Sequence, residues 1–311
     1  MTRDLPGLYA SVTRSRDRWE LRSGDEGYPP CLDELPGELG VLYGIGSPSA
    51  LGGPCISIVG SRRATPYGLA CARMAGRVAA ECGITVVSGG AMGCDHEASK
   101  AALDAGGRTV IVAGTGADVV YPRSSDDIFA DAVRRGGCVI SLERWGSAPR
   151  KYAFPKRNRV IAALSRSLLV CEAGVPSGTF STAGCASELG RGVYAIPGSI
   201  FSPLSRGANW LLESGASIIP DEQALEMRIS LDYNRLRLVS EGGGEESLDS
   251  LLEALVACPM RPDEVARAFS MDLSQALMTL ASHEAAGMVR QLPDGRFAPT
   301  EEVLLRRHAR L

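Results

Sequence analysis

ISIVGSRRATPYGLACARMAGR, residues 56–77, predicts the first unit of a doubly wound α/β fold. The run ISIV is apolar and β-branched, which is typical of a buried parallel strand. A loop bounded by Gly60 and Gly68 follows, with Thr65 as a helix cap and Pro66 as the first helical residue. Backbone amides at such a strand–loop–helix junction favour an anion, usually a phosphate.

The loop carries two arginines, Arg62 and Arg63, beside the positive end of the expected helix. It lacks the further glycines of a dinucleotide loop and the Lys-Ser/Thr pair of a P-loop. We therefore expect Gly60 to be part of a phosphate site, and we expect no cofactor. A structural turn with exposed arginines is the alternative, because a single glycine-rich turn is a weak signal.

The same plan recurs along the chain as buried strands that are followed by glycine turns or helices. The recurring segments are 84–107, 108–116, 138–143, 167–192, 192–198 and 209–220. This alternation predicts a Rossmann-like, mainly parallel sheet covered by helices on both faces. Because the glycine turns follow strands, they gather at the carboxyl edge of the sheet, where such folds bind ligands.

The chain divides into four expected parts: a lead-in over 1–54, a Rossmann-like domain over 55–225, a linker over 226–245 and a small domain over 246–311. The lead-in is rich in Pro and Gly and is expected to pack on the sheet edge through Leu42 and Tyr43. The linker is acidic and glycine-rich. Three amphipathic helices and a Pro-Asp-Gly hairpin then predict a winged helix.

Composition places the chain among ordinary globular proteins, with 45% hydrophobic and 22% charged residues in 311. No apolar run reaches the roughly 18 residues that a membrane helix needs, so we expect no membrane contact. The N-terminus lacks the apolar core of a signal peptide. The nine cysteines are scattered without a CxxC pair. This pattern is typical of small buried apolar residues rather than of disulfides, and it indicates a reducing compartment. We therefore expect a cytoplasmic protein.

Charge is distributed unevenly along the chain. Residues 55–225 carry 18 basic and 14 acidic side chains, a balance of +4, whereas 246–300 carry 4 basic and 8 acidic side chains, a balance of −4. A polyanion should therefore meet the first region and be repelled by the second.

RWGSAPRKYAFPKRNRVIAALSR, residues 144–166, carries seven basic side chains and interleaved aromatic rings. Basic groups follow phosphates and rings stack on splayed bases, so the pattern favours single-stranded nucleic acid. The candidates are Phe154, Lys156, Arg157, Asn158 and Arg159. The alternative is a solvated loop that leads into a helix, whose apolar side chains and the Phe154 ring lie in the core.

Two further loops could hold phosphate. SGGAMG supplies Ser88 and Gly89, and SGTFSTA supplies Ser177, Gly178 and Thr179. Helix capping alone would account for one or two of the hydroxyl groups.

Catalytic signals are weak. The three histidines lie far apart and have no metal-binding spacing, and neither a GxSxG nor a P-loop motif is present. Asp95-His96-Glu97 resembles an acid/base cluster, but such residues are also typical of a capped, acidic first helical turn. We expect no catalytic residue and no metal site.

The chain resembles the DNA-processing protein A (DprA, or Smf) family. The matching segments are IVGSRRATPYG, VVSGGAMGCD, YP at 121–122, FPKRNRVIAALS, SGTFSTA, YAIPG and GANWLLESGA. They span about residues 28–220. The YPPCL…LY…G lead-in and the terminal winged helix are also similar to that family.

The resemblance implies a non-catalytic, single-stranded DNA-binding homodimer with an extended Rossmann fold. Its implied role is to protect incoming DNA in natural transformation and to help load the recombinase RecA. The implied DNA-binding residues are Ser61, Arg62, Phe154, Arg157, Asn158 and Arg159, with Lys156 as a neighbour.

The chain departs from the family pattern in three places. Ser99 stands where a histidine is usual, and Ser141-Leu142-Glu143 stands where Ser and Glu are usually adjacent. Only about 27 residues precede the YPPCL segment, so the helical module that many members carry there is not expected.

Two other functions stay open at this stage. A nucleotide phosphoribohydrolase would use Asp95 or Glu172 at the sugar, and it would release free base from nucleoside monophosphates. A nucleotide-signal sensor would bind a small nucleotide tightly and use the winged helix on duplex DNA, although the −4 balance of 246–300 argues against the second part.

Overall fold

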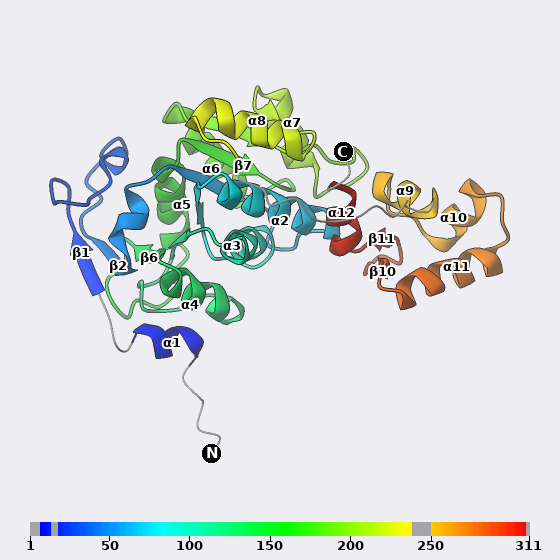
Figure 1. Ribbon diagram of the computed structural model, residues 1–311, viewed down its shortest axis with the longest axis horizontal. Helices are drawn as coiled ribbons and strands as arrows, with labels where there is room; N and C mark the ends of the chain where they lie inside the picture. Colours follow the sequence, from blue (N-terminus) through cyan, green and yellow to red (C-terminus); the bar gives the residue numbers. More distant parts are fainter. Residues whose placement is uncertain (1–6, 14–17, 238–249, 309–311) are drawn as a thin grey trace, which may run out of the picture. The chain divides into compact units, whose positions relative to one another are not determined.

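The protein is described here by a computed structural model, which places residues 7–13, 18–237 and 250–308 (Figure 1). It divides into a larger unit that contains the main sheet and a smaller C-terminal unit. None of the helices in the described ranges is long and apolar enough to cross a membrane.

The larger unit is built on one nine-stranded sheet with the order β1-β2-β6-β5-β4-β3-β7-β8-β9. The strands are β1 Arg18–Leu21, β2 Leu42–Gly46, β3 Cys55–Val59, β4 Thr85–Ser88, β5 Thr109–Val112, β6 Cys138–Ser141, β7 Ser167–Val170, β8 Gly192–Ala195 and β9 Ser217–Ile218. The pairs β1/β2 and β2/β6 are antiparallel, and all others are parallel. The expected mainly parallel sheet is confirmed.

Helices cover both faces of this sheet. They are α1 Leu8–Thr13, α2 Pro66–Glu81, α3 Cys94–Asp104, α4 Asp126–Arg134, α5 Ala153–Leu164, α6 Gly178–Glu188, α7 Arg206–Glu213 and α8 Glu222–Tyr233. Successive side chains of a strand point to opposite faces of the sheet, so those of β5 pack in different cores. Val110 and Val112 pack in one core with residues of α5, α6 and α7, whereas Ile111 packs in another with residues of α1 and α4.

The opening unit forms as the sequence predicts. All five residues of β3 are buried, and α2 begins at Pro66 after its cap, Thr65. The Thr65 hydroxyl accepts a hydrogen bond from the Gly68 amide at 3.2 Å. Helix α2 buries Ala70, Met74 and Val78, which are spaced at one turn and share one helix face.

The lead-in contributes two strands to the sheet. Strand β2 pairs antiparallel with β6, with Tyr43 opposite Ser141, and β1 pairs with β2 at the sheet edge. Leu42 is buried in the main core. The larger unit therefore includes residues 18–46, although the sequence predicted that it begins after residue 54.

Helix α8 runs through the boundary expected at residue 225, so the predicted linker begins inside a helix. Arg237 holds the chain after α8 against α2, with Nε 2.6 Å from Glu81 Oε2 and Nη2 2.6 Å from Glu222 Oε1. The remaining part of the predicted linker, from residue 238, lies outside the described residues.

The smaller unit has the three helices and the hairpin that the winged-helix prediction requires. They are α9 Ser250–Ala257, α10 Pro262–Ala268, α11 Leu273–Ala285, β10 Val289–Gln291 and β11 Phe297–Pro299. A further helix, α12 Glu301–His308, was not predicted. The hairpin turns at Gly295, whose φ of +83° is a conformation that glycine adopts without strain. Leu255, Val265 and Leu280 meet in a separate core, which gives this unit its own hydrophobic centre.

His96 of α3 contacts two carboxylates, Glu97 of the same helix and Asp127 of α4, and the second contact links the two helices. Its Nδ1 lies 3.3 Å from Glu97 Oε1, and its Nε2 lies 3.1 Å from Asp127 Oδ1. Arg73 in turn lies 2.5 Å from Glu97. The hydrogen bond to Glu97 raises the pKa of His96, burial opposes the rise, and Asp127 adds to it.

This arrangement predicts a pH-dependent contribution to stability. The folded pKa of His96 lies above its unfolded value, so its contribution is complete below about pH 6.5 and is lost as pH rises through the folded pKa. We expect His96→Gln to cost up to about 1 kcal/mol at low pH and less at high pH. Urea unfolding from about pH 6 to pH 8 checks this, and a constant difference between the two chains would contradict it.

Candidate nucleic-acid interface

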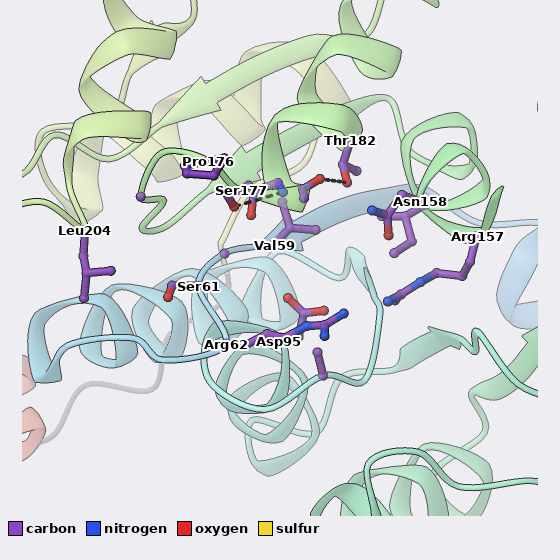
Figure 2. A pocket seen from close by; sticks show the side chains of 16 residues that line it. Val59, Ser61, Arg62, Asp95, Arg157, Asn158, Pro176, Ser177, Thr182 and Leu204 are labelled. Carbon is purple, nitrogen blue, oxygen red and sulfur yellow. Dashed lines mark hydrogen bonds between the residues drawn. The ribbon is translucent and has the colours of Figure 1, made fainter. Parts of the chain in front are cut away.

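A cavity of about 430 Å³ opens at the carboxyl ends of β3 and β7 (Figure 2). Strands β4, β5 and β6 lie on one side of β3, and β7, β8 and β9 lie on the other, so the strand order reverses at this point. Open α/β sheets bind ligands in the crevice at such a switch point. Segments 59–62 and 174–179, which follow the two strands, line the cavity together with α5.

Helix α6 directs its N-terminus toward this cavity. Ser177 is its cap, and the Ser177 hydroxyl accepts a hydrogen bond from the Thr179 amide at 3.1 Å. Gly178 is the first helical residue, and a Cβ placed there would lie 3.9 Å from Asn158 Nδ2 of α5. The partial positive charge of the helix end and the Asn158 amide thus meet at one wall, which suits an anion.

Two arginines of different exposure reach the cavity from opposite sides (Figure 2). Arg62 is exposed on the loop after β3, whereas Arg157 of α5 is only 6% exposed. The Arg157 Nη1 donates a hydrogen bond to the Val112 carbonyl oxygen at 3.2 Å. Arg62 can therefore contact a ligand directly, while Arg157 is held inside the wall.

Asp95 is the buried counter-charge of Arg157. Burial raises the pKa of Asp95, and the Arg157 charge and the amides of Gly89, Gly60 and Ala91 oppose that rise. Burial lowers the pKa of Arg157 to about 10, against the attraction of Asp95. The Gly89 amide donates a hydrogen bond to Asp95 Oδ2 at 3.1 Å. Each of the two charges lessens the cost of burying the other.

Gly89 is required where these groups meet. A Cβ at this position would lie 1.5 Å from Arg157 Nη1 and 2.7 Å from Asp95 Oδ2. Any side chain would thus displace the guanidinium from its place beside the carboxylate.

A second, smaller hollow of about 50 Å³ adjoins the cavity and shares Arg62 and Arg157 with it. Its other walls are mainly apolar. The Phe154 ring centroid lies 5.7 Å from that of Tyr121 and 5.6 Å from the Arg62 guanidinium carbon. This hollow joins a cation to aromatic rings, which is the combination that single-stranded nucleic acids favour.

The structure brings most of the predicted residues together. Gly60, Ser61, Arg62, Arg157, Asn158, Ser177, Gly178 and Thr179 line the larger cavity, and Phe154 and Gly89 line the smaller hollow.

Three predicted residues lie elsewhere. The Ser88 hydroxyl is buried and donates to the Ile58 carbonyl oxygen at 3.1 Å. Arg159 Nη2 donates to the Pro36 carbonyl oxygen at 3.5 Å. Lys156, like these two, lines neither hollow.

Two of the three sequence departures, at Ser99 and at 141–143, also lie outside the cavity walls. Ser99 is buried on α3. The Ser141 hydroxyl donates to the Thr115 carbonyl oxygen and accepts from the Glu143 amide, the latter at 2.9 Å. Neither side chain therefore forms part of the candidate binding site.

Sequence reasoning missed the pairing of Asp95 with Arg157, and it gave no role to Tyr121 or Met92. A signal for the buried arginine was present. Arg157 precedes Val160, Ile161 and Leu164 by three, four and seven residues, and this spacing places all four on one helix face. Tyr121 belongs to the YP segment that matches the family, but it stands on a loop, so no periodicity indicated where its side chain lies.

Comparison with protein families identifies both units. The model of DNA recombination-mediator protein A matches residues 20–230, and the model of the DprA winged helix domain matches residues 241–295. The first match covers more than half of the 311 residues.

Individual relatives agree with these matches. The chain is 33% identical to protein Smf of Escherichia coli over 88% of this chain and 76% of that protein. It is 38% identical to DNA processing protein DprA of Streptococcus pneumoniae over 64% of this chain and 70% of that protein. It is 37% identical to protein Smf of Synechocystis over 66% of this chain and 52% of that protein.

Solved structures show the same fold. The structure of DNA processing protein A from Streptococcus pneumoniae matches with a TM-score of 0.63 and 34% identity over 70% of this chain and 76% of that one. The structure of the Helicobacter pylori protein matches with a TM-score of 0.63 and 27% identity over 71% of this chain and 99% of that one. The chain therefore belongs to the DNA recombination-mediator protein A family, which is also called DprA or Smf.

Proposed function

We propose that this protein binds single-stranded DNA at the carboxyl edge of its sheet and acts as a recombination mediator. The observation that carries the proposal is the cavity in which Arg62, Asn158 and the N-terminus of α6 converge. The Helicobacter pylori relative is described for its single-stranded DNA binding mode, which supports the same ligand here.

The residues of the cavity have two roles in this proposal, direct contact with DNA and support of the cavity wall. Arg62 contacts a backbone phosphate, and Ser61, Asn158 and Thr179 offer polar groups around it. Arg157 positions the wall through Asp95 and the Val112 carbonyl, and it adds positive potential from inside. Lys156 and Arg159 contribute to the field around the site rather than to the cavity.

Membership of the family supports a wider role. We propose that the protein acts as a cytoplasmic homodimer, protects DNA during natural transformation and helps to load RecA. Within the larger unit, Ile200, Phe201 and Trp210 are exposed apolar side chains of one short segment. Exposed apolar side chains of this size suit a protein–protein contact.

The proposed activity is binding without catalysis. A phosphoribohydrolase would present the Asp95 carboxylate to a sugar. Here that carboxylate accepts a hydrogen bond from the Gly89 amide and faces Arg157. Glu172 is likewise buried. Release of free base from a nucleoside monophosphate by the purified protein would instead support the enzyme.

A binding titration over a range of salt concentrations tests the proposed function. We expect tighter binding of an oligothymidylate than of a duplex of equal length, with the logarithm of affinity falling linearly with the logarithm of salt concentration. Equal affinity for both, or no affinity for either, would contradict the proposal.

The winged helix is expected to add little to DNA affinity. Its third helix, α11, exposes Leu273, Leu277 and Met278, and residues 246–300 carry a balance of 4 basic and 8 acidic side chains. Phosphate attraction supplies most non-specific affinity, so this unit lacks the main source of DNA binding. Its exposed apolar side chains suit protein contact better.

This expectation can be tested with two fragments. A chain that ends at Ser240 should keep most single-strand affinity, within about threefold, because its arginine cavity is intact. Residues 246–311 alone should show no measurable binding at physiological salt. Anisotropy titrations measure both, and micromolar binding by the isolated unit would favour the nucleotide-signal sensor.

A further inference from the structure

The two hollows beside Arg62 differ in chemistry. The larger one combines apolar side chains with hydroxyl and amide groups from Ser61, Asn158 and Ser177, whereas the smaller one is lined mainly by rings and apolar side chains. A nucleotide has the same division, because its phosphate is charged and its base is flat and largely apolar. Arg62 and Arg157 belong to both hollows, so they stand where phosphate and base would join.

Phe154 is already surrounded by neighbours within this hollow. A Cβ at Gly114 would lie 2.7 Å from Phe154 Cδ1, so the ring packs directly on that glycine. The Arg62 guanidinium carbon lies 5.6 Å from the ring centroid, and the Tyr121 ring lies 5.7 Å away. Phe154 is therefore only partly exposed and supports Arg62 and Tyr121.

Tyr121 and Met92 are, by contrast, open to solvent. They are 44% and 48% exposed, although both are large and apolar. Single exposed apolar residues are ordinary on protein surfaces. Here the two line one hollow next to two arginines, which is the arrangement of a stacking surface beside a phosphate contact.

We propose that Tyr121 is the platform on which a nucleobase of the bound single strand stacks. Met92 forms the neighbouring apolar wall, and Phe154 holds the Tyr121 ring and Arg62 in place. The adjoining phosphate lies in the larger cavity. This inference rests on the proposed function, and it identifies the ligand of the smaller hollow as a base of any sequence, because every base has a stacking face.

The test compares the full chain with Tyr121→Ala, Tyr121→Phe, Phe154→Ala and Met227→Ala. Met227 is the matched control, because it is 66% exposed on α8 and lines neither hollow. Each chain is titrated with a short oligothymidylate and with an oligonucleotide of equal length made of abasic sites. Both ligands carry the same phosphates, so the ratio of the two affinities reports base stacking.

We expect the full chain and the Met227→Ala variant to prefer the oligothymidylate by about tenfold or more. Tyr121→Ala should lose most of this preference with an unchanged salt slope, while Tyr121→Phe should keep it because the ring remains. Melting temperatures should agree among the chains.

Different failures have different meanings. If the full chain binds the oligothymidylate and Tyr121→Ala keeps the full preference, the stacking inference is overturned and the proposed function stands. Loss of the preference in Phe154→Ala alone would assign the platform to that ring instead. If the full chain binds neither ligand, the proposed function fails.

Discussion

Arg62→Ala is expected to lower affinity for single-stranded DNA by at least tenfold. Arg62 is the exposed arginine common to both hollows, and it lies over the Phe154 ring. A charge-assisted hydrogen bond to phosphate contributes roughly 1.5–3 kcal/mol, which corresponds to about tenfold or more. The salt slope should also fall by about one phosphate contact, for every sequence tested.

Arg63→Ala is the matched control for this prediction. It removes the same charge from the next position, which is also exposed but lines neither hollow. Its effect should stay below about threefold, because a solvated surface charge acts weakly. Equal losses in the two variants would show that the loop acts only through its total charge.

Asp95→Ala is expected to destabilise the larger unit by about 3–5 kcal/mol. The change leaves Arg157 buried at 6% exposure without its counter-charge, and it also removes the acceptor of the Gly89 amide. The remaining guanidinium would have to lose its proton or pull the wall open toward water. Urea unfolding measures the loss, and DNA affinity should fall with it because the cavity wall is disturbed.

Asp104→Ala is the control for Asp95→Ala, because it removes a negative charge from the same helix, α3, without removing the buried counter-charge of Arg157. Asp104 is exposed and lies 4.0 Å from Arg135, so its removal should cost under about 1 kcal/mol. Comparable destabilisation of both variants would refute the role given to the buried pair.

The fold could be predicted mainly where local patterns and tertiary packing agree. The buried run before Gly60 and the Thr65-Pro66 cap defined β3 and α2, and the Pro-Asp-Gly turn defined the hairpin of the winged helix. In these places, strand periodicity, capping and turn chemistry all indicate the same element.

The lead-in shows where local patterns are insufficient. Its Pro- and Gly-rich sequence predicts little regular structure, yet β1 and β2 form because β6 offers an unpaired edge to residues 42–46. A strand that depends on a partner about a hundred residues away has no local signal of its own. The same reason explains why the register was not foreseen.

The sequence predicted which residues form the candidate site better than it predicted what each of them does. The sequence named Phe154, Lys156, Arg157, Asn158 and Arg159 as candidates without distinguishing their directions, but a helix turns by about 100° per residue and so directs neighbours to different faces. Arg157 is buried, Asn158 lines the cavity, and Arg159 turns to the Pro36 carbonyl. Tyr121 lies on the hollow only because the β5–α4 loop brings it to Phe154.

Photocrosslinking tests the central claim, DNA binding at this edge of the sheet, most directly. The full chain is irradiated with an oligothymidylate that carries 4-thiothymidine, and the attached peptides are identified by mass spectrometry. We predict attachment within 60–62, 121–122, 154–158 and 176–182, with Arg62→Ala reducing all of it. Attachment concentrated in 250–308, or on the larger unit away from these segments, would contradict the account.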